Sequence, residues 1–367
     1  MRAELSAAVA AALERCTRPS LVFDLARLDA NVAALADAAT RAGLTPLFAA
    51  KAFPHPAVHA MAAARLAGFD VASPAELAQV IEVARPGQLL SVADPSGRAI
   101  AAAARWTGRL LISCDTVAQV EAAPRHAEVA LRISASITGA DPAIGAILDG
   151  SGHRRSRFGV DVDRDALRRA IGELARAAGP RPIGLHVHHG AVAATSGDRF
   201  IATARAALAA AADAGVEPRF IDLGGAWHAV ADLPGALAAI RAALPASLEL
   251  LFEPGRLFAA GAGFACGRVA VARALGDREL RVIELSRSCH LRWSQPQLVA
   301  PPPRTGAGCP TLFVGPTCYE DDALGEWTVE PARYVAGAQA VFRNITGYAV
   351  AWNTGFGGLA PADVVMV

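Results

Sequence analysis

The chain has 367 residues, a formal net charge of +1 and a hydrophobic fraction of 53%, which provides enough apolar side chains for the core of one large domain or two ordinary ones. Its charges are dispersed without basic runs, which argues against a nucleic-acid partner. The alanine-rich residues 1–16 include Glu4, Glu14 and Arg15 and are too few to span a bilayer, so we expect an amphipathic surface helix and no membrane partner.

Strand-like apolar runs alternate with helical segments along the first two thirds of the chain. An opening strand at 21–23 and a helix at 26–42 are followed by eight further runs, at 46–50, 68–72, 88–92, 109–113, 128–134, 182–188, 218–223 and 248–253. Eight β/α units over about 200–250 residues are typical of a (β/α)8 barrel of the TIM type. The segment 136–162 is longer than the other connections, and we expect it to form a loop at an active site or at a contact.

From about Leu257 the pattern changes to β-type runs, at 267–274, 280–285, 311–314 and 340–350, with a proline-rich loop at 300–310. The sequence therefore predicts an α/β fold with a barrel domain at 26–256. A smaller C-terminal β-rich domain is expected at 257–367, joined by the N-terminal strand 20–25.

The cysteines show no CxxC pair and no zinc-ligand spacing, which favours a reducing cytoplasm over a disulfide framework. They are Cys16, Cys114, Cys266, Cys289, Cys309 and Cys318.

Residues 47–53 (LFAAKAF) contain Lys51, the only lysine of the chain. Arginine serves at least as well for surface charge or phosphate contact, so a single retained lysine indicates an amine that must lose its proton and act as a nucleophile. The alternative is a chance survivor on a solvated surface. The apolar run 47–50 places Lys51 at the C-terminal end of a buried strand, where α/β enzymes often carry their chemistry.

Other conspicuous polar residues and glycines also fall at strand ends, so we expect them at one mouth of the barrel: Asp70, Arg132, His186, His188, Gly224, Gly225 and Glu253. The last two predicted strands are followed by LGGAW and EPGRL, and loops at these positions often bind phosphate in barrel enzymes. Glycines, Gly255 included, permit close backbone approach, and Arg256 adds a charged fork. An amine and a phosphate cradle at one mouth suggest pyridoxal phosphate, an aldehyde that forms a Schiff base.

Nine motifs in order resemble the fold type III decarboxylases that use pyridoxal phosphate, the ornithine/diaminopimelate decarboxylase family. They are FAAKAFPHPAV, GFDVASPAEL, LRI, RFGVD, GLHVHHG, DLGGA, EPGR, GPTCYEDD and GY-x7-F-x-G, and they run from about residue 20 to residue 358. The resemblance implies an alanine racemase/decarboxylase-like architecture, with a barrel and a β-rich domain.

The resemblance also implies roles for individual residues. Lys51 forms the Schiff base, Asp70 and Arg132 support the cofactor's surroundings, and His188 stacks on the pyridine ring. The phosphate is held by Gly224, Gly225, Gly255, Arg256 and Tyr348.

The resemblance pairs Glu253 with the pyridine nitrogen, where a carboxylate keeps the ring protonated and makes the cofactor a strong electron sink. Alanine racemases of the same fold place an arginine there, so Glu253 favours decarboxylation over racemisation. Cys318 occupies the family's proton-donor position and is expected to reach the site of the other subunit in a homodimer. Arg292 lies near the position of a substrate-carboxylate arginine.

The chain departs from the family pattern at several positions. Ala226 replaces the third glycine of a GGG loop, and Ala191 replaces a serine. Tyr319 stands where relatives that produce diamines carry an acidic residue for the distal ammonium group. Glu320, Asp321 and Asp322 could compensate; otherwise the substrate lacks a distal cation. We expect a specialised amino acid or amino-acid-like substrate.

Simpler interpretations and rival functions remain open. His186, His188 and His189 could form a metal site, which the absence of an apparent acidic third ligand disfavours; no metal is expected. Asp222 is expected to support the glycine loop, and Glu253 could pair with Arg256. Arg154, Arg155 and Arg157 are read as a solvated or dimer-facing cluster. The rival functions are a racemase or epimerase with the same cofactor and a non-catalytic regulatory homologue.

Overall fold

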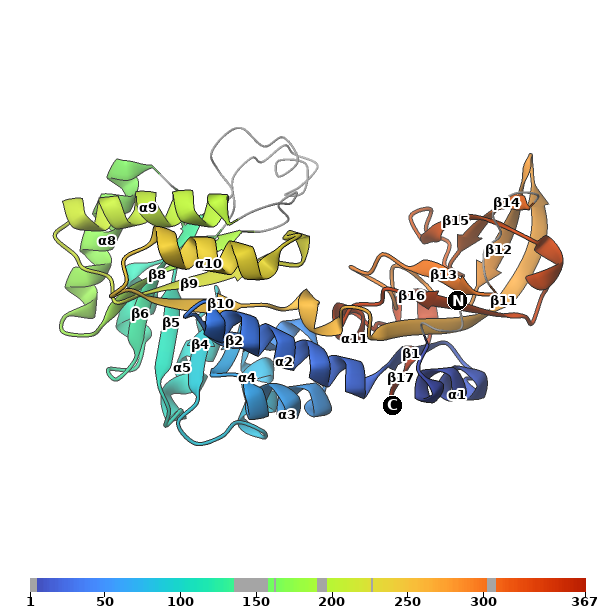
Figure 1. The fold of residues 1–367 in the computed structure, drawn as a ribbon, viewed down its shortest axis with the longest axis horizontal. Coiled ribbons are helices and arrows are strands. Elements are labelled where there is room, and N and C mark those ends of the chain that lie inside the picture. The colour runs from blue at the N-terminus through green and yellow to red at the C-terminus, as the bar shows by residue number, and fades with distance from the viewer. Residues whose placement is uncertain (1–4, 135–157, 162, 190–196, 226, 302–307) are drawn as a thin grey trace. The chain divides into compact units, whose positions relative to one another are not determined.

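The structure is a computed structural model that describes residues 5–134, 158–161, 163–189, 197–225, 227–301 and 308–367. The chain divides into two compact units (Figure 1). The barrel unit comprises residues 32–51 and 56–257, and the β unit comprises residues 1–31, 52–55 and 258–367. Most of the segment predicted at 136–162 and of the proline-rich loop predicted at 300–310 lies outside the described residues, as do Ala191, Ala226 and the cluster of Arg154, Arg155 and Arg157.

The barrel unit contains a closed barrel of parallel strands. Its strands are β2 (Thr45–Ala49), β3 (Gly68–Val71), β4 (Leu89–Val92), β5 (Leu110–Cys114), β6 (Glu128–Ser134), β8 (Ile183–His189), β9 (Phe220–Gly225) and β10 (Glu249–Glu253). Neighbours pair in the order β5-β4-β3-β2-β10-β9-β8-β6, and a further pairing of β5 with β6 closes the ring. The short strand β7 (Val160–Asp161) adds to β6. The predicted barrel is confirmed, and each of its eight predicted runs overlaps one strand.

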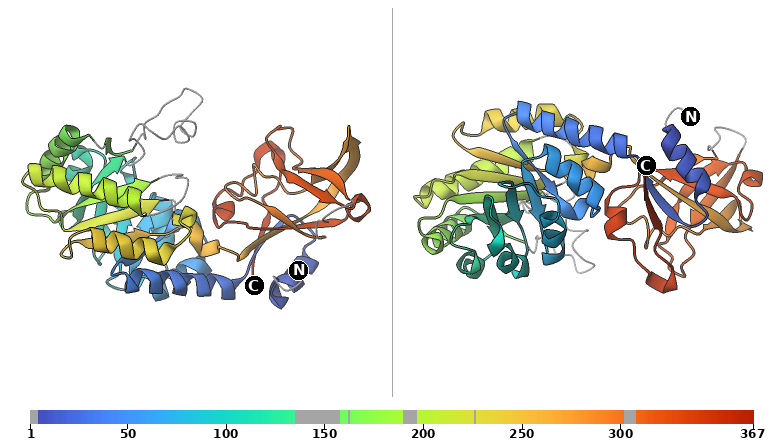
Figure 2. Two further views of the ribbon diagram at one scale, coloured as in Figure 1. Left: turned by 45° about the horizontal axis from the view of Figure 1, so that its top comes forward. Right: turned by 90° about the horizontal axis from the view of Figure 1, so that it is seen from below.

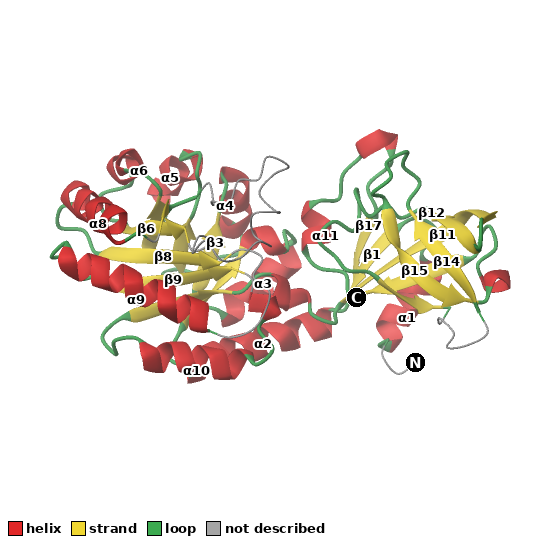
Figure 3. Cartoon of the chain, turned by 90° about the horizontal axis from the view of Figure 1, so that it is seen from above, coloured by secondary structure: helices red, strands yellow, loops and turns green. Residues whose placement is uncertain are grey.

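Helices cover the outside of the barrel (Figures 2 and 3). They are α2 (Leu25–Arg41), α3 (Pro56–Arg65), α4 (Pro74–Ile81), α5 (Arg98–Ala102), α6 (Val117–Ala122), α8 (Arg164–Ala178), α9 (Asp198–Asp213) and α10 (Leu233–Ala243). In α8, the buried residues Leu167, Ile171, Leu174 and Ala178 recur at helical spacing along one face. Side-chain caps such as Ser73 on α4 and Asp163 on α8 set where these helices begin.

The β unit is built around a second sheet. Its strands are β1 (Ser20–Phe23), β11 (Gly263–Leu275), β12 (Arg278–Ile283), β13 (Gln297–Ala300), β14 (Cys309–Val314), β15 (Ala323–Val329), β16 (Gln339–Arg343) and β17 (Asp363–Met366). β1 lies between β11, with which it is antiparallel, and β17, with which it is parallel (Figure 3). A β-rich second region is therefore confirmed, with β13, β15 and β17 added to the predicted strands.

Two helical segments of the β unit test the sequence interpretation. The N-terminal helix α1 (Ala7–Arg15) buries Val9, Ala12 and Leu13 in a cluster with strand residues, which confirms an amphipathic surface helix. The predicted strand 340–350 is wrong in its second half. β16 ends before Asn344, whose φ of 65° is left-handed, and the chain then forms α11 (Tyr348–Ala351). No helix among the described residues is long and apolar enough to cross a bilayer.

Strand register brings the predicted polar residues of the barrel to one end. Arg132 of β6 is level with His186 of β8, which is level with Asp222 of β9. Glu253 of β10 is level with Gly224, and Asp70 of β3 is level with Ala49, two residues before Lys51. Because these strands are parallel, the residues gather at the C-terminal mouth of the barrel.

Candidate active site

Lys51 is held at the mouth of the barrel by a buried carboxylate. It lies in the helical turn η2 (Ala50–Ala52) directly after β2. Its Nζ donates a hydrogen bond of 2.6 Å to Oδ2 of Asp70. The Asp70 side chain is 1% exposed, whereas that of Lys51 is 38% exposed. The Lys51 amine is thus held by a buried carboxylate and is still partly exposed to solvent, which suits a group that must react with an incoming molecule.

Two further predicted residues, Arg132 and His188, lie on the strands across the barrel. The Arg132 guanidinium carbon lies 4.5 Å from the centre of the Phe158 ring, and burial lowers its pKa from the ordinary value. Burial, with smaller effects from Arg132 and Lys51, lowers the pKa of His188 to about 3. His188 is therefore a neutral imidazole at physiological pH, a flat ring without charge.

The glycine pair at the end of β9 leaves no room for side chains. A Cβ on Gly224 would lie 2.7 Å from Oε2 of Glu253 and 2.8 Å from Cδ2 of His188. Gly225 has a φ of 132°, and a Cβ there would lie 2.0 Å from the carbonyl oxygen of His189. Gly225 must be glycine because of its positive φ and the nearby His189 backbone. At Gly224, a side chain would displace the side chains of Glu253 and His188.

The two loops that follow β9 and β10 are linked by side chains. Nη1 of Arg256, which begins the turn η5 (Arg256–Ala259), lies 3.2 Å from Nε2 of His228 in η4 (Trp227–Ala229). Burial, followed by the Arg256 charge, lowers the pKa of His228 to about 4. A neutral His228 can therefore accept a hydrogen bond from Arg256. Gly255 directly precedes Arg256 in this loop.

Trp227 supports these loops from inside the barrel unit, a role that sequence analysis missed. Its ring stacks on Phe200 at 4.3 Å and meets the edge of Phe252 at 4.9 Å. Its Nε1 donates to the carbonyl oxygen of Leu223 at 3.1 Å. The sequence feature that could have indicated this role is the position of the aromatic residue, two residues after the Gly-Gly pair.

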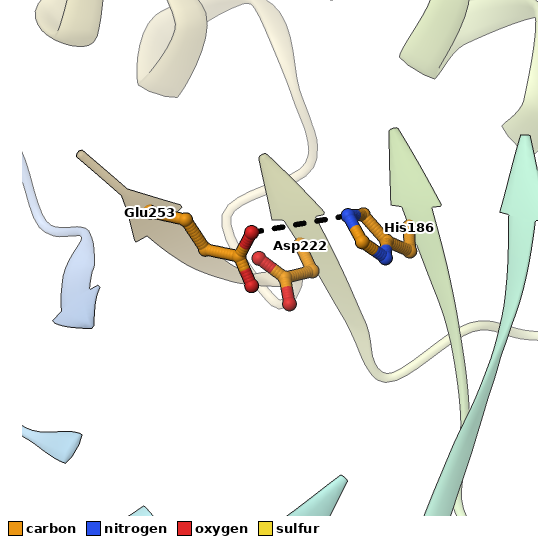
Figure 4. A group of neighbouring side chains, drawn as sticks. All are labelled: His186, Asp222 and Glu253. Atoms are coloured by element: carbon orange, nitrogen blue, oxygen red, sulfur yellow. Dashed lines mark ion pairs between the residues drawn. The ribbon is translucent and has the colours of Figure 1, made fainter. Parts of the chain in front are cut away.

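Behind Glu253 lies a buried group of polar side chains (Figure 4). Oε2 of Glu253 is 3.9 Å from Nε2 of His186, and the Asp222 carboxyl lies beside that of Glu253. Two serines complete the group: Ser113 Oγ is 2.6 Å from Nδ1 of His186, and Ser91 Oγ donates to Oδ2 of Asp222 at 3.3 Å. Sequence analysis missed both serines, although each interrupts a buried apolar run.

This group changes two expectations. Asp222 does not direct its carboxyl to the glycine loop in any hydrogen bond among the described residues, but toward Ser91 and Glu253. The sequence showed no apparent acidic residue that could serve as a third metal ligand, but in the structure acidic side chains lie close to His186. One donor atom each from His186, Asp222 and Glu253 lie within 4.8 Å of one another, a spacing that could also hold a metal ion.

The two carboxyl groups cannot both ionise freely in this setting. Burial raises the pKa of Asp222 to about 7. Burial, then the nearby Asp222 and Asp70 charges, raise the pKa of Glu253 well above its ordinary range. Oδ1 of Asp222 and Oε1 of Glu253 are buried and find no N–H or O–H donor among the described residues. One proton is therefore shared between the two carboxyls near neutral pH.

The remaining predicted residues belong to the β unit. Cys318, Tyr319 and Glu320 are exposed on the loop between β14 and β15, with Tyr319 53% exposed. The Arg292 guanidinium carbon lies 4.6 Å from the centre of the Trp352 ring. Tyr348 at the start of α11 contacts the Trp293 ring at 4.8 Å.

Asp322 differs from its neighbours because it is buried and hydrogen-bonded. Oδ1 accepts from Ser286 Oγ at 2.9 Å and from the Ser288 amide at 3.2 Å. Oδ2 accepts from the Thr317 hydroxyl at 2.7 Å and from its amide at 3.3 Å. Asp322 therefore joins the Cys318 loop to the loop that precedes Arg292.

Comparisons with known proteins agree with one another. Residues 25–260 match the family described as pyridoxal-dependent decarboxylase, pyridoxal binding domain. The chain is 30% identical over 268 residues to a diaminopimelate decarboxylase of Deinococcus radiodurans, covering 72% of this chain and 67% of that protein.

Solved structures share the fold over nearly the whole chain. An arginine decarboxylase of Paramecium bursaria Chlorella virus, bound to agmatine, gives a TM-score of 0.81 at 18% identity, with 99% of this chain and 100% of that chain covered. A lysine/ornithine decarboxylase of Vibrio vulnificus, complexed with cadaverine, gives a TM-score of 0.78 at 21% identity, with 99% of each chain covered.

Proposed function

Because the chain belongs to the pyridoxal-dependent decarboxylase family, we propose that it removes the α-carboxyl group of an amino acid or amino-acid-like substrate, with Lys51 as the residue that binds the cofactor. The observation that carries this proposal is the position of Lys51 Nζ, 2.6 Å from the buried Asp70 carboxylate at the C-terminal mouth of the barrel.

The described residues fit pyridoxal phosphate. Glu253 offers a buried carboxylate oxygen, Oε1, that has no donor among the described residues and suits a protonated ring nitrogen. His188 offers a neutral flat ring beside it. We propose that Gly224, Gly225, Gly255 and Arg256, together with Tyr348, hold the phosphate. We therefore assign Glu253 to the ring nitrogen rather than to a metal ion.

When bound, pyridoxal phosphate supplies an electron sink for the electron pair left on Cα after CO2 departs. Lys51 would hold the cofactor through a covalent bond to its aldehyde carbon. Asp70 would hold the Lys51 amine at the mouth whenever that bond is open. The half-buried Arg132 interacts electrostatically with Asp115, Asp70, Glu253 and Asp222, and its positive charge offsets theirs.

We propose that the two units correspond to domains at 26–256 and 257–367, the second including strand 20–25, and that the enzyme is a homodimer with shared active sites. Cys318 would return a proton to Cα from the partner subunit. Its exposure on the β unit supports this role.

The six cysteines form no disulfide, which supports a reducing cytoplasm as the location of the enzyme.

The substrate-side residues support a substrate without a distal cation. Tyr319 presents an exposed aromatic ring directly after Cys318. The Asp322 carboxylate already accepts four hydrogen bonds within its own unit, so we propose that it fixes the loop rather than binding a distal ammonium. Arg292 remains the candidate for a charged contact with such a substrate, whereas Glu320 would have no distal cation to bind.

The direct test is covalent trapping on Lys51. The purified protein should be yellow with pyridoxal phosphate, and borohydride should fix the cofactor on the peptide that contains Lys51, read by mass spectrometry. Lys51→Ala should lose trapping and CO2 release. Lys51→Arg is the matched control because it keeps the cation for Asp70 but cannot bind the aldehyde, so it should retain stability and lose trapping.

Three outcomes would overturn the assignment. One is a colourless protein whose spectrum pyridoxal phosphate does not change. Another is wild-type turnover in either Lys51 variant. Interconversion of amino-acid enantiomers without CO2 release would indicate the racemase instead.

A further inference from the structure

The group behind Glu253 has more polar atoms than cofactor binding alone requires. Four strands contribute to it: Ser91 from β4, Ser113 from β5, His186 from β8 and Asp222 from β9. His186 and Asp222 are 1% and 2% exposed, so neither can contact a substrate in solution. Burying polar groups this deeply is costly unless each finds a partner. His186 and Asp222 share one neighbour, the carboxyl group of Glu253 (Figure 4).

Ser113 and Glu253 together select the tautomer of His186. Burial lowers the pKa of His186 well below its ordinary value, with Arg132, His188 and Lys51 adding to the effect, so the imidazole is neutral. Ser113 Oγ lies 2.6 Å from Nδ1, and a carboxylate oxygen is the group near Nε2, so we assign the ring proton to Nε2 and the donated hydroxyl proton to the Ser113–Nδ1 contact. Nε2 faces Oε2 of Glu253 at 3.9 Å. At 3.9 Å this contact is longer than a hydrogen bond, so the His186 N–H acts on Glu253 as a nearby dipole and adds no charge.

Asp222 is the second group that faces Glu253. The two carboxyls are close enough to form a hydrogen bond when one of them carries a proton. The other charged groups around them are Asp70 on β3, Lys51 after β2 and Arg132 on β6. A cation at Glu253 favours the arrangement in which Glu253 is ionised and Asp222 holds the proton, because opposite charges attract most strongly at the shorter distance.

We propose that Asp222 and His186 are positioning residues that act through Glu253. Asp222 holds the shared proton and donates it in a hydrogen bond to Glu253, and the N–H of His186 is directed toward the same carboxylate. Glu253 thereby keeps one negative charge to pair with the ring nitrogen of the cofactor. This inference rests on the proposed function for the identity of the cofactor. It adds that Asp222 is neutral in the loaded enzyme.

Asp222→Asn distinguishes a neutral Asp222 from a charged one. Asparagine has nearly the same shape and still donates a hydrogen bond, but it cannot be an anion. The full-length protein is loaded with pyridoxal phosphate carrying nitrogen-15 in its ring, and the nitrogen chemical shift reports the protonation of that atom. We expect a protonated ring nitrogen at neutral pH in the wild type and in Asp222→Asn, and an unprotonated one in Glu253→Gln.

The kinetics should follow the same order. Asp222→Asn should lose at most about tenfold in kcat, the equivalent of one pKa unit, while Asp222→Ala, which removes the donor, should lose more and shift the ring toward the unprotonated form. His186→Gln, which keeps a donor, should preserve the nitrogen shift better than His186→Leu. Melting temperature and cofactor stoichiometry identify any variant that fails to fold.

An unprotonated ring nitrogen in a folded, loaded Asp222→Asn enzyme would overturn the proposal, because it would mean that Asp222 acts as an anion. One equivalent of metal that remains bound in the purified wild type would also overturn it. Neither result touches the proposed function, which depends on trapping at Lys51 and on CO2 release by the wild type.

Discussion

At the scale of single residues, the site depends on buried groups whose ionisation is constrained. Lys51 was proposed from sequence as the only lysine, directly after a buried apolar run, and Asp70, Arg132, His188 and Glu253 were proposed because each falls in or at the end of a predicted strand. Ser91 and Ser113 could not be assigned partners in this way. Ser113 and His186 are 73 residues apart in sequence, and they meet only because β5, β6 and β8 are neighbours in the closed barrel.

The raised pKa of Asp222 makes the stability of the cofactor-free protein depend on pH. Its folded value of about 7 lies above the ordinary 3.8, so its contribution is fully present below 3.8 and is lost as pH rises toward 7. Asp222→Asn removes this group from the titration, although Glu253, Asp70, Lys51 and Arg132 remain around it. We expect the wild type to lose more stability than the variant between about pH 5 and about pH 8.

Denaturant unfolding of both cofactor-free proteins at the two pH values measures this difference. Each pKa unit corresponds to about 1.4 kcal/mol. Ser91→Ala is the control, because it removes a neutral hydrogen bond to Asp222 and leaves the acidic groups in place. Equal pH dependence in the wild type and Asp222→Asn would contradict the raised pKa.

At the scale of elements, the barrel was predicted more completely than the β unit. Barrel strands are buried on both sides and read as continuous apolar runs. β15 (ALGEWTV) is mostly half-buried and mixes polar with apolar residues, so it carries no such signal. The failure at 340–350 has a local cause: apolar residues recur on both sides of Asn344, but the left-handed backbone at Asn344 ends the strand.

Asp322 is predicted to control the order of the loop that carries Cys318. Asp322→Ala leaves the donors on Ser286, Ser288 and Thr317 without their shared acceptor, and a buried donor without a partner costs about 1–3 kcal/mol. We therefore expect a lower melting temperature and faster proteolysis of the Cys318 loop, with cofactor trapping on Lys51 retained. Asp321→Ala, at an exposed neighbouring position, is the matched control and should leave both unchanged. A normal melting temperature in Asp322→Ala would count against this role.

At the scale of the whole molecule, sequence order conceals how the chain is divided. Residues 52–55 belong to the β unit although they directly follow Lys51, and β1 belongs there although it precedes the barrel. The β11 and β17 partners of β1 begin more than 200 residues later, so no local pattern identifies them. The β-type runs after about Leu257 indicated a second region, and the N-terminal strand 20–25 was expected to join it.

The proposed homodimer with shared active sites predicts complementation between two inactive variants. In a mixed dimer of Lys51→Ala with Cys318→Ala, one site receives an intact lysine from one chain and an intact cysteine from the other. Random mixing should therefore restore about a quarter of wild-type CO2 release. Activity of the mixture is compared with each variant alone after joint unfolding and refolding. A mixture no more active than its components would place both residues in the same chain's site.

The parallel pairing of β1 with β17 also matters during synthesis on the ribosome. β1 leaves the exit tunnel before any barrel strand, yet neither of its neighbours in the sheet exists until the entire barrel has been translated. The nascent barrel can close while the backbone N–H and C=O groups of β1 are still without their strand partners. A chaperone that shields this strand would therefore act on a segment that is made before the barrel and paired only after it.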